Sequence, residues 1–407
     1  MAAVRLDSGL PVLLLRTDHN LFHHGTLGVI RSLGRAGVPV HAVLEGRRNP
    51  VSRSRHLHRA HPWAPPAQRP SALLGHLRMI GERIPGGPAL LLPMDDAGGR
   101  DLAAEYADAL APRFAVPPQD PDVPRRVADK ARLLAACTEH DVPAPQARIP
   151  RTADDVHDAI KSLDLPVIAK WARPWLLPRG LRSTTLVHDA ADVHRLFACA
   201  ADHEAGPLVL QRRIPLDGGD WFFQGYFDAA GECRYGGVGR KHLAHPPQAG
   251  HTVAGEWVDN PALYDHAVRV VGLLGCRGLV DLDFRLDPDT GDYRLLDFNP
   301  RIGAQFRLFT DARGLDLARV LHLDQSGRAV PDARPSIGRN LLVENHYLRR
   351  ALGPRPRTGA LRPLRAADEL AWYAGDDLRP FFAMGRQSAL RAAEHFRAAR
   401  RDRPSRP

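Results

Sequence analysis

Acidic and amide side chains lie in two apolar segments between residues 279 and 299, where they could bind a metal ion. The segments read LVDLDFRL and YRLLDFN, and the turn sequence DPDTGD joins them, which predicts a β-hairpin. Because side chains alternate along a strand, Asp297 and Asn299 share one face, and Asp283 of the first strand could face them. Two carboxylates and an amide oxygen suit Mg²⁺ that is shared with phosphate oxygens. The alternative, ordinary polar groups at strand ends, fits less well because carboxylates among apolar residues are costly to bury unpaired.

Lysine is rare in this chain, which makes each lysine a candidate phosphate contact. Of 56 basic residues only Lys130, Lys161, Lys170 and Lys241 are lysines. A compact ammonium and a planar guanidinium contact phosphate differently, so lysines retained in an arginine-rich chain are of interest. Lys161 lies in the helix before the strand LPVIAK and is expected to be a surface residue.

The sequence DFNPR, from Asp297 to Arg301, resembles the acid-x-Asn-x-Arg motif on the metal-binding hairpin of the ATP-grasp superfamily. The resemblance covers residues 10–345, and upstream lysines occur in the order found in that family. It implies that Asp283, Asp297 and Asn299 bind the metal. It also implies that Arg301 lies beside the reacting carbonyl, where a fixed cation stabilises developing negative charge.

The same resemblance assigns further residues to the nucleotide. Lys130 and Lys170 would contact its phosphates, and a loop over residues 171–185 would cover them. The other side chains expected to bind the nucleotide, in that loop and in the adenine-binding segment LVLQRRIPLDGGD, are Arg182, Ser183, Gln211, Arg212, Ile214 and Asp220. Arg240 and Lys241 are the candidates for a catalytic cation that faces the γ-phosphate, and strand alternation allows only one of them to point inward.

Strand and helix patterns place these motifs in an α/β chain whose C-terminal half is of the α+β type. Strands alternate with helices up to residue 120, which indicates a parallel sheet, and the loops 19–25 and 94–99 follow strand ends where ligands bind. The Pro-rich segment 117–124 is the predicted linker, and one helix is expected over 123–140. The resemblance implies an ATP-grasp fold with an N-terminal parallel α/β domain (1–120), a small lid domain (121–206), a β-rich metal and nucleotide domain (207–345) and a C-terminal extension with a basic tail (346–407).

Within the superfamily the sequence is most similar to stand-alone bacterial carboxylate–amine ligases. This resemblance implies an ADP-forming enzyme that uses ATP and two Mg²⁺ ions, for which Mn²⁺ could substitute. Its partners would be small-molecule carboxylate and amine substrates, which it joins through an acyl phosphate, and a second copy in a homodimer. Two alternatives stay open: an ATP-grasp enzyme with a thiol or phosphoryl acceptor, and a nucleotide-binding regulator without turnover.

Composition argues against several other classes of protein. The net charge is +10, but half of it comes from the segment after residue 385, where seven arginines stand against two acidic residues. We therefore expect a basic C-terminal helix and tail, and no nucleic-acid-binding groove. No apolar stretch approaches the roughly 20 residues of a membrane span, and no signal peptide is recognised. The four cysteines have no paired spacing, which favours a reducing cytoplasm.

Other catalytic motifs are absent from the sequence. His23–His24 and the run His56, His58 and His61 lack the spacing of a metal site, so we expect solvated loop histidines. There is no G-x-S-x-G nucleophile elbow, and the first 120 residues contain no G-x-G-x-x-G. Serine hydrolase and nicotinamide-binding functions are therefore not favoured.

Overall fold

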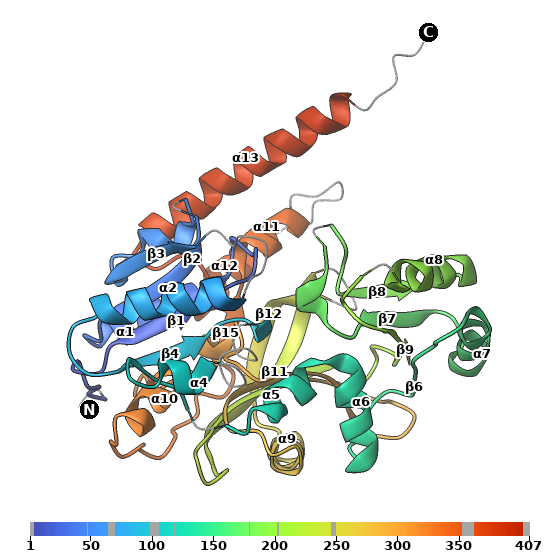
Figure 1. Ribbon diagram of the computed structural model, residues 1–407, viewed down its shortest axis with the longest axis horizontal. Coiled ribbons are helices and arrows are strands. Elements are labelled where there is room, and N and C mark those ends of the chain that lie inside the picture. Colours follow the sequence, from blue (N-terminus) through green and yellow to red (C-terminus); the bar gives the residue numbers. More distant parts are fainter. Residues whose placement is uncertain are drawn as a thin grey trace.

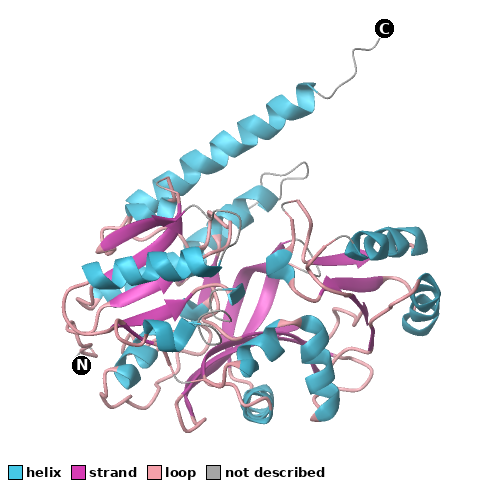
Figure 2. Cartoon of the chain, viewed as in Figure 1, coloured by secondary structure: helices cyan, strands magenta, loops and turns pink. Residues whose placement is uncertain are grey.

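The computed structural model shows a chain built from three β-sheets with helices packed around them (Figures 1 and 2). It describes residues 4–46, 48–63, 70–97, 106–117, 119–178, 180–201, 203–245, 250–351 and 362–401. A parallel sheet comes first along the chain, an antiparallel sheet second and a large mixed sheet third. The fold is therefore α/β with a β-rich second half, which confirms the predicted class.

The first sheet has the strand order β3-β2-β1-β4-β5, and all its strands are parallel. Its central strand β1 (Val12–Leu15) is fully buried, because residues packed on both of its faces belong to separate hydrophobic clusters. The other elements of this part are β2 (Val40–Glu45), β3 (Arg59–Trp63), β4 (Ala89–Pro93), β5 (Phe114–Ala115), α1 (His24–Arg35), α2 (Pro70–Arg83) and α4 (Ala107–Leu110). Residues 94–97 of the expected loop 94–99 are described, and residues 98 and 99 lie outside the described part of the chain.

The strand order changes direction between β1 and β4, which makes the sheet edge after these strands a topological switch point. The loops after β1 and β4 lie side by side at this edge. Asp95 of the second loop joins them, because its carboxylate accepts a hydrogen bond from the Asp18 N–H at 3.0 Å and another from the Thr17 N–H. These are the loops in which the sequence predicts part of a substrate pocket.

The second sheet is antiparallel and has the order β6-β9-β7-β8. Its elements are β6 (Ala147–Arg148), β7 (Val167–Trp171), β8 (Thr184–Val187), β9 (Leu208–Arg212), α7 (Ala153–Leu163) and α8 (Ala190–Ala201). The predicted boundary at residue 206 assigns β9 to the third domain, but β9 pairs with β6 and β7. The reason is packing, since Leu208 and Leu210 complete the separate hydrophobic cluster of this sheet.

The helix predicted over 123–140 is interrupted at Asp129 and forms two helices, α5 (Asp122–Ala128) and α6 (Lys130–Glu139). The Asp129 side chain accepts hydrogen bonds from the Ala131 N–H at 2.9 Å and the Arg132 N–H at 3.1 Å, which caps α6. Lys130 is thereby the first residue of α6, and its N–H donates to the Ala172 carbonyl at 2.9 Å. The break brings Lys130 next to the end of β7.

The third sheet has the order β14-β13-β10-β11-β12-β15-β16 and is antiparallel except for the β15–β16 pair. Its elements are β10 (Asp220–Phe227), β11 (Cys233–His245), β12 (His251–Val258), β13 (Gly278–Leu286), β14 (Tyr293–Asn299), β15 (Asn340–Leu342), β16 (Glu369–Leu370), α9 (Pro261–Leu273) and α10 (Leu317–Gln325). Strands β13 and β14 are the predicted hairpin.

The chain after residue 345 returns to the first part of the molecule. Its helices are α11 (Glu344–Ala351), α12 (Arg362–Ala366) and α13 (Arg379–Arg401). Asp377 pairs with Arg31 of α1 at 3.0 Å, and both side chains are 1% exposed. Helix α13 then extends away from the body, so the predicted basic C-terminal helix is present (Figure 1). No helix in the described part of the chain has the length and apolar character of a membrane span.

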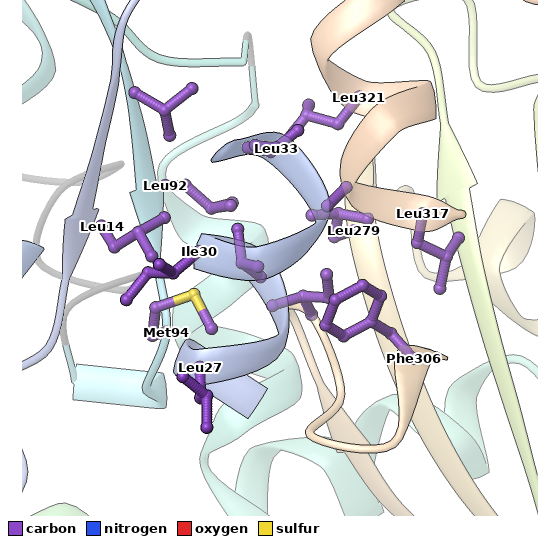
Figure 3. Close-up of a cluster of buried hydrophobic side chains, with 14 of the residues drawn as sticks. Leu14, Leu27, Ile30, Leu33, Leu92, Met94, Leu279, Phe306, Leu317 and Leu321 are labelled. Carbon is purple, nitrogen blue, oxygen red and sulfur yellow. The ribbon is translucent and has the colours of Figure 1, made fainter. Parts of the chain in front are cut away.

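Helix α1 packs between the first and third sheets and holds them together (Figure 3). Leucine and isoleucine side chains of α1 contact strands of the first sheet on one side and helix α10 on the other. The labelled residues of this cluster are Leu14, Leu27, Ile30, Leu33, Leu92, Met94, Leu279, Phe306, Leu317 and Leu321. Burial of each leucine contributes roughly 1.5–3 kcal/mol, so this apolar interface fixes the relative position of the two sheets.

Candidate active site

A cleft lies at the switch point of the first sheet, and residues of all three sheets line it. The loops after β1 and β4 form one end, the β13–β14 hairpin forms the floor, and β7 and β8 contribute from the second sheet. A smaller cavity adjoins it on the side of β9. The predicted site residues that line one or both cavities are Lys130, Lys170, Ser183, Gln211, Arg212, Ile214, Asp220, Lys241, Asp283, Asp297, Asn299 and Arg301.

The acidic face of the hairpin follows from its strand register. Asp283 lies opposite Asp297, and Asp281 lies opposite Asn299. The Asn299 Nδ2 donates to the Asp281 carbonyl at 3.3 Å, so the amide oxygen of Asn299 is available as a ligand. All four side chains line the cleft, and Asp281 is a carboxylate that the sequence-based prediction did not include. Its signal was present, since LVDLDF places Asp281 and Asp283 on one face of a strand.

Each lysine of the cleft is held by the β13–β14 hairpin. Lys241 Nζ donates to Asp283 at 2.6 Å, and Lys170 Nζ donates to the Leu296 carbonyl at 2.6 Å. Lys130 pairs with Asp297. Ammonium groups and carboxylates therefore lie together on the floor of the cleft, where anionic phosphates and a cation would meet groups of opposite charge.

Burial and charge shift the pKa values of these groups in different directions. Burial lowers the pKa of Lys170 to about 8, although Asp297 favours its charged form. Burial disfavours the charge of Lys241 too, but Asp283 outweighs it and raises the pKa of Lys241. Burial opposes ionisation of Asp297, yet Lys130 and Lys170 lower the pKa of that carboxyl. Lys130 and Lys170 thus favour the ionised form of Asp297, the form that a metal ion needs as a ligand.

The donor set of the hairpin fits Mg²⁺ only as part of a larger coordination shell. Asp283, Asp297 and Asn299 offer hard oxygen donors, the type that Mg²⁺ prefers. No group of three or more His, Cys, Asp or Glu residues in the described part of the chain could hold a metal by itself. Phosphate oxygens would therefore have to complete the shell, as expected for a metal that binds together with a nucleotide.

Arg301 lies at the end of the hairpin, between two carboxylates. Its Nε donates to Asp96 of the loop after β4 at 2.9 Å, and its Nη1 donates to Asp281 at 3.2 Å. Burial opposes the guanidinium charge, but Asp96 and Asp281 outweigh it and raise the pKa of Arg301. Burial raises the pKa of Asp281 to about 6 against the attraction of Arg301. Arg301 stays a cation under all ordinary conditions and links the first sheet to the third.

The smaller cavity contains the residues predicted for adenine and ribose. Gln211 is buried on β9, and Arg212, Ile214 and Asp220 follow it around the cavity. Arg285 of β13 fixes this wall, because its Nε donates to Asp220 at 2.6 Å and its Nη1 donates to the Ile214 carbonyl at 3.0 Å. Arg285 was not among the predicted residues.

Two predicted residues do not belong to the cleft. Strand alternation on β11 turns Lys241 inward and leaves Arg240 exposed, with its guanidinium 5.3 Å from the ring centroid of Trp221. Arg182 is exposed beside β8 and lines neither cavity, whereas the adjacent Ser183 lines the larger one. Arg240 and Arg182 thus lie outside the lining of both cavities, and their assignments to catalysis and to the nucleotide stay predictions.

The histidines expected to be solvated are partly buried. His23 caps helix α1, because its Nδ1 accepts from the Thr26 N–H at 3.1 Å, which leaves Nε2 as the protonated nitrogen of the neutral ring. Burial, assisted by Arg16, lowers the pKa of His23 well below its usual value. His24 and His61 are buried as well. His23 and His24 line the end of the cleft near the loop after β1.

Comparison with known proteins shows which sequences the chain resembles. No family model matches the chain. The chain is similar to the D-aspartate ligase of Enterococcus faecium, with 24% identity over 249 residues that cover 58% of this chain and 58% of that protein. It is also similar to the C-terminal section of the carbamoyl phosphate synthase large chain of Methanopyrus kandleri, with 23% identity over 229 residues that cover 54% of this chain and 41% of that protein. The matches span between 6% and 58% of the length of the curated relatives.

Solved structures resemble the chain over most of its length. The L-amino acid ligase from Bacillus licheniformis gives a TM-score of 0.61 at 14% identity and covers 83% of this chain and 79% of its own. The biotin carboxylase domain of the Hydrogenobacter thermophilus 2-oxoglutarate carboxylase, solved with MgADP, ADP and bicarbonate, gives 0.59 at 15% identity, with 80% and 72% covered. The chain thus shares the fold of these enzymes, which agrees with the predicted ATP-grasp architecture. The sequence comparison thus includes a D-aspartate ligase, and the structure comparison includes an L-amino acid ligase.

Proposed function

We propose that the protein is an ATP-grasp ligase that activates a carboxylate as an acyl phosphate and joins it to an amine, releasing ADP and phosphate. The observation that carries the proposal is the continuity of the two cavities, since Lys170, Lys241, Asp283 and Asp297 line both. A nucleotide with its base in the smaller cavity would extend its phosphates over these lysines and carboxylates. The fold and the similarity to ligases support the same activity.

The chain's own residues divide between the parts of the nucleotide. Gln211, Arg212, Ile214 and Asp220 would hold adenine and ribose in the smaller cavity. The phosphate ligands would be Lys130, Lys170, Lys241 and Ser183. Three of these four are lysines at the junction of the second and third sheets, so their positive charges would neutralise part of the negative charge of a triphosphate from two sides.

Asp283, Asp297 and Asn299 would hold the metal, and the proposal includes two Mg²⁺ ions, with Mn²⁺ as a substitute. Mg²⁺, when bound, neutralises negative charge on the phosphates. Lys130 and Lys241, which pair with two of these carboxylates, would turn toward the phosphates as the metal takes their place.

The chemistry follows from the position of Arg301 beyond the metal ligands. A carboxylate oxygen attacks the γ-phosphorus, the bond to the bridging oxygen breaks, and ADP leaves. The amine nitrogen then attacks the acyl carbon, phosphate leaves with the electrons of the C–O bond, and the nitrogen loses a proton. The guanidinium of Arg301 stabilises the negative charge that develops on the carbonyl oxygen. No side chain becomes covalently attached, so the protein contributes position and charge.

The proposal extends to the partners and location of the protein. The substrates are a small-molecule carboxylate and a small-molecule amine, and the cleft is open to the loops after β1 and β4 that would contact them. A cytoplasmic location and a homodimer belong to the same proposal.

The test is a screen of amino acids and amines for stimulated release of phosphate from Mg-ATP, followed by isotope transfer. With oxygen-18 in the substrate carboxylate, we expect one labelled oxygen in the released phosphate and an amide in the product. The Asp297→Asn protein, which keeps the shape of the side chain, serves as the inactive control.

Other outcomes would identify the alternatives. Unlabelled phosphate, or transfer of the phosphoryl group to a stable product, would replace carboxylate activation by a kinase activity. ADP formation that depends on a thiol would change the acceptor. Tight ATP binding without turnover under any condition of the screen would leave a regulator as the better description.

A further inference from the structure

Both edges of the Arg301 guanidinium already donate hydrogen bonds to protein groups, so a substrate carboxylate would have to displace one of them. Its end-on edge, formed by Nη1 and Nη2, is engaged at Nη1 by Asp281 at 3.2 Å and by the Ile302 carbonyl at 3.2 Å. Its side-on edge, formed by Nε and Nη2, is engaged at Nε by Asp96 at 2.9 Å. A carboxylate binds a guanidinium most strongly through two parallel hydrogen bonds along one edge. A substrate carboxylate can therefore bind in this way only if Asp281 or Asp96 leaves.

Asp281 is built into the sheet and has little freedom to leave. Its side chain is 8% exposed and accepts a further hydrogen bond from Gln224 Nε2 at 2.9 Å. Gln224 is fully buried, and the chain passes so close at Gly303 that an added Cβ would lie 1.8 Å from Gln224 Nε2. The absence of a side chain at Gly303 thus preserves the contact between Gln224 and Asp281.

Asp96 has the opposite character. It lies in the loop after β4, its side chain is 21% exposed, and Arg301 is its one hydrogen-bond partner among the described residues. If Asp96 left Arg301, the Nε edge of the guanidinium would be the one buried group of the described structure to lose its partner. That edge is then free to bind another carboxylate.

We propose that Asp96 is a placeholder for the substrate carboxylate, which displaces it from the Nε side of Arg301, while Asp281 stays and orients the guanidinium. This inference rests on the proposed carboxylate activation, and it identifies Asp96 as the group that competes with the substrate carboxylate for Arg301. Asp96 thereby sets how tightly a carboxylate binds, and Asp281 is a positioning residue.

The first test measures access to Arg301 without turnover. Phenylglyoxal modifies free guanidinium groups, and the extent of reaction at Arg301 is followed by peptide mass spectrometry while acetate is added as a small carboxylate. We expect acetate to protect Arg301 in Asp96→Asn at a concentration about fivefold lower than in the wild type, the upper range for a partly exposed ion pair. Asp18→Asn is the matched control, because Asp18 lines the same cleft but pairs with Arg16. Equal protection in Asp96→Asn and wild type, or an equal shift in Asp18→Asn, would overturn the proposal.

The second test uses the carboxylate that the phosphate-release screen identifies. Asp96→Asn should lower the KM for that carboxylate and leave the KM for ATP unchanged, whereas an Asp96 that only positions Arg301 would lower kcat without lowering the KM. The latter result would also refute the placeholder. A failed screen would count against the ligase activity alone, because the acetate measurement does not depend on turnover.

Discussion

Lys170 should make ATP binding depend on pH in the range just above neutrality. Burial lowers the pKa of its ammonium to about 8, although Asp297 favours the charged form. A phosphate placed beside Lys170 would restore the charge, so ATP should bind the protonated form. Between pH 7 and 9 the charged fraction falls from about 0.9 to about 0.1, and the dissociation constant should therefore rise about tenfold, or about 1.4 kcal/mol.

Titration calorimetry with Mg-ATP at several pH values measures this effect directly. In buffers of different ionisation enthalpy, the wild type should take up about half a proton at pH 8, because half of the free Lys170 is then uncharged. Lys170→Met should bind ATP more weakly and lose this proton uptake. Lys170→Arg keeps a permanent charge, so its affinity should not fall between pH 7 and 9. Lys161→Met is the silent control, because Lys161 is exposed on α7.

A particular pattern of results would refute the reasoning. If Lys170→Met retained the pH dependence of the wild type, another group would be responsible. If Lys161→Met weakened binding as much as Lys170→Met, the phosphate contact itself would be in error.

Four further variants test the rest of the site and its support. Asp297→Asn and Asn299→Ala should each reduce turnover below about a tenth of wild type with an unchanged circular dichroism spectrum, and a higher rate would remove them from the metal site. Arg301→Ala should lower kcat and raise the KM for the carboxylate but leave the ATP dissociation constant unchanged in calorimetry, because its partners are the substrate carboxylate and the charge that develops on it. Asp377→Ala should lower the free energy of unfolding in urea by ~3–5 kcal/mol, because it leaves the buried guanidinium of Arg31 without its carboxylate partner. The exposed ion pair of Asp376 makes Asp376→Ala the control, with a cost of at most about 1 kcal/mol.

The hairpin could be predicted from sequence because its chemistry follows a local period. Alternation alone puts Asp297 and Asn299 on one face, and the observed register sets Asp283 opposite Asp297. The same alternation showed that Arg240 and Lys241 cannot both point inward, but it could not choose between them. That choice depends on which face of β11 is covered by the rest of the sheet, which is a property of the fold as a whole.

Contacts between distant segments had no signal in the sequence. Arg301 and Asp96 are 205 residues apart, and Arg31 and Asp377 are 346 residues apart. Each pair forms because the first and third sheets pack against each other, and local periodicity contains no information about such packing. The same limit explains why the sequence could not assign β9 to the second sheet, since strand pairing decides to which sheet a strand belongs.

The three sheets are coupled with unequal strength, and this difference bears on how the site works. The first and third sheets share one hydrophobic cluster and the buried Arg31–Asp377 pair, and each buried leucine of that cluster contributes roughly 1.5–3 kcal/mol. The second sheet has its own cluster and meets the hairpin through hydrogen bonds such as that from Lys170 to the Leu296 carbonyl, each worth about 0.5–1.5 kcal/mol. Movement of the second sheet therefore costs far less than separation of the other two. Arg301 and Asp281 lie on the rigid interface, whereas Lys170 lies on the sheet that can move. The substrate carboxylate would thus bind at a cation whose position is fixed by the first and third sheets. The second sheet, which carries Lys170, could move to enclose the phosphates.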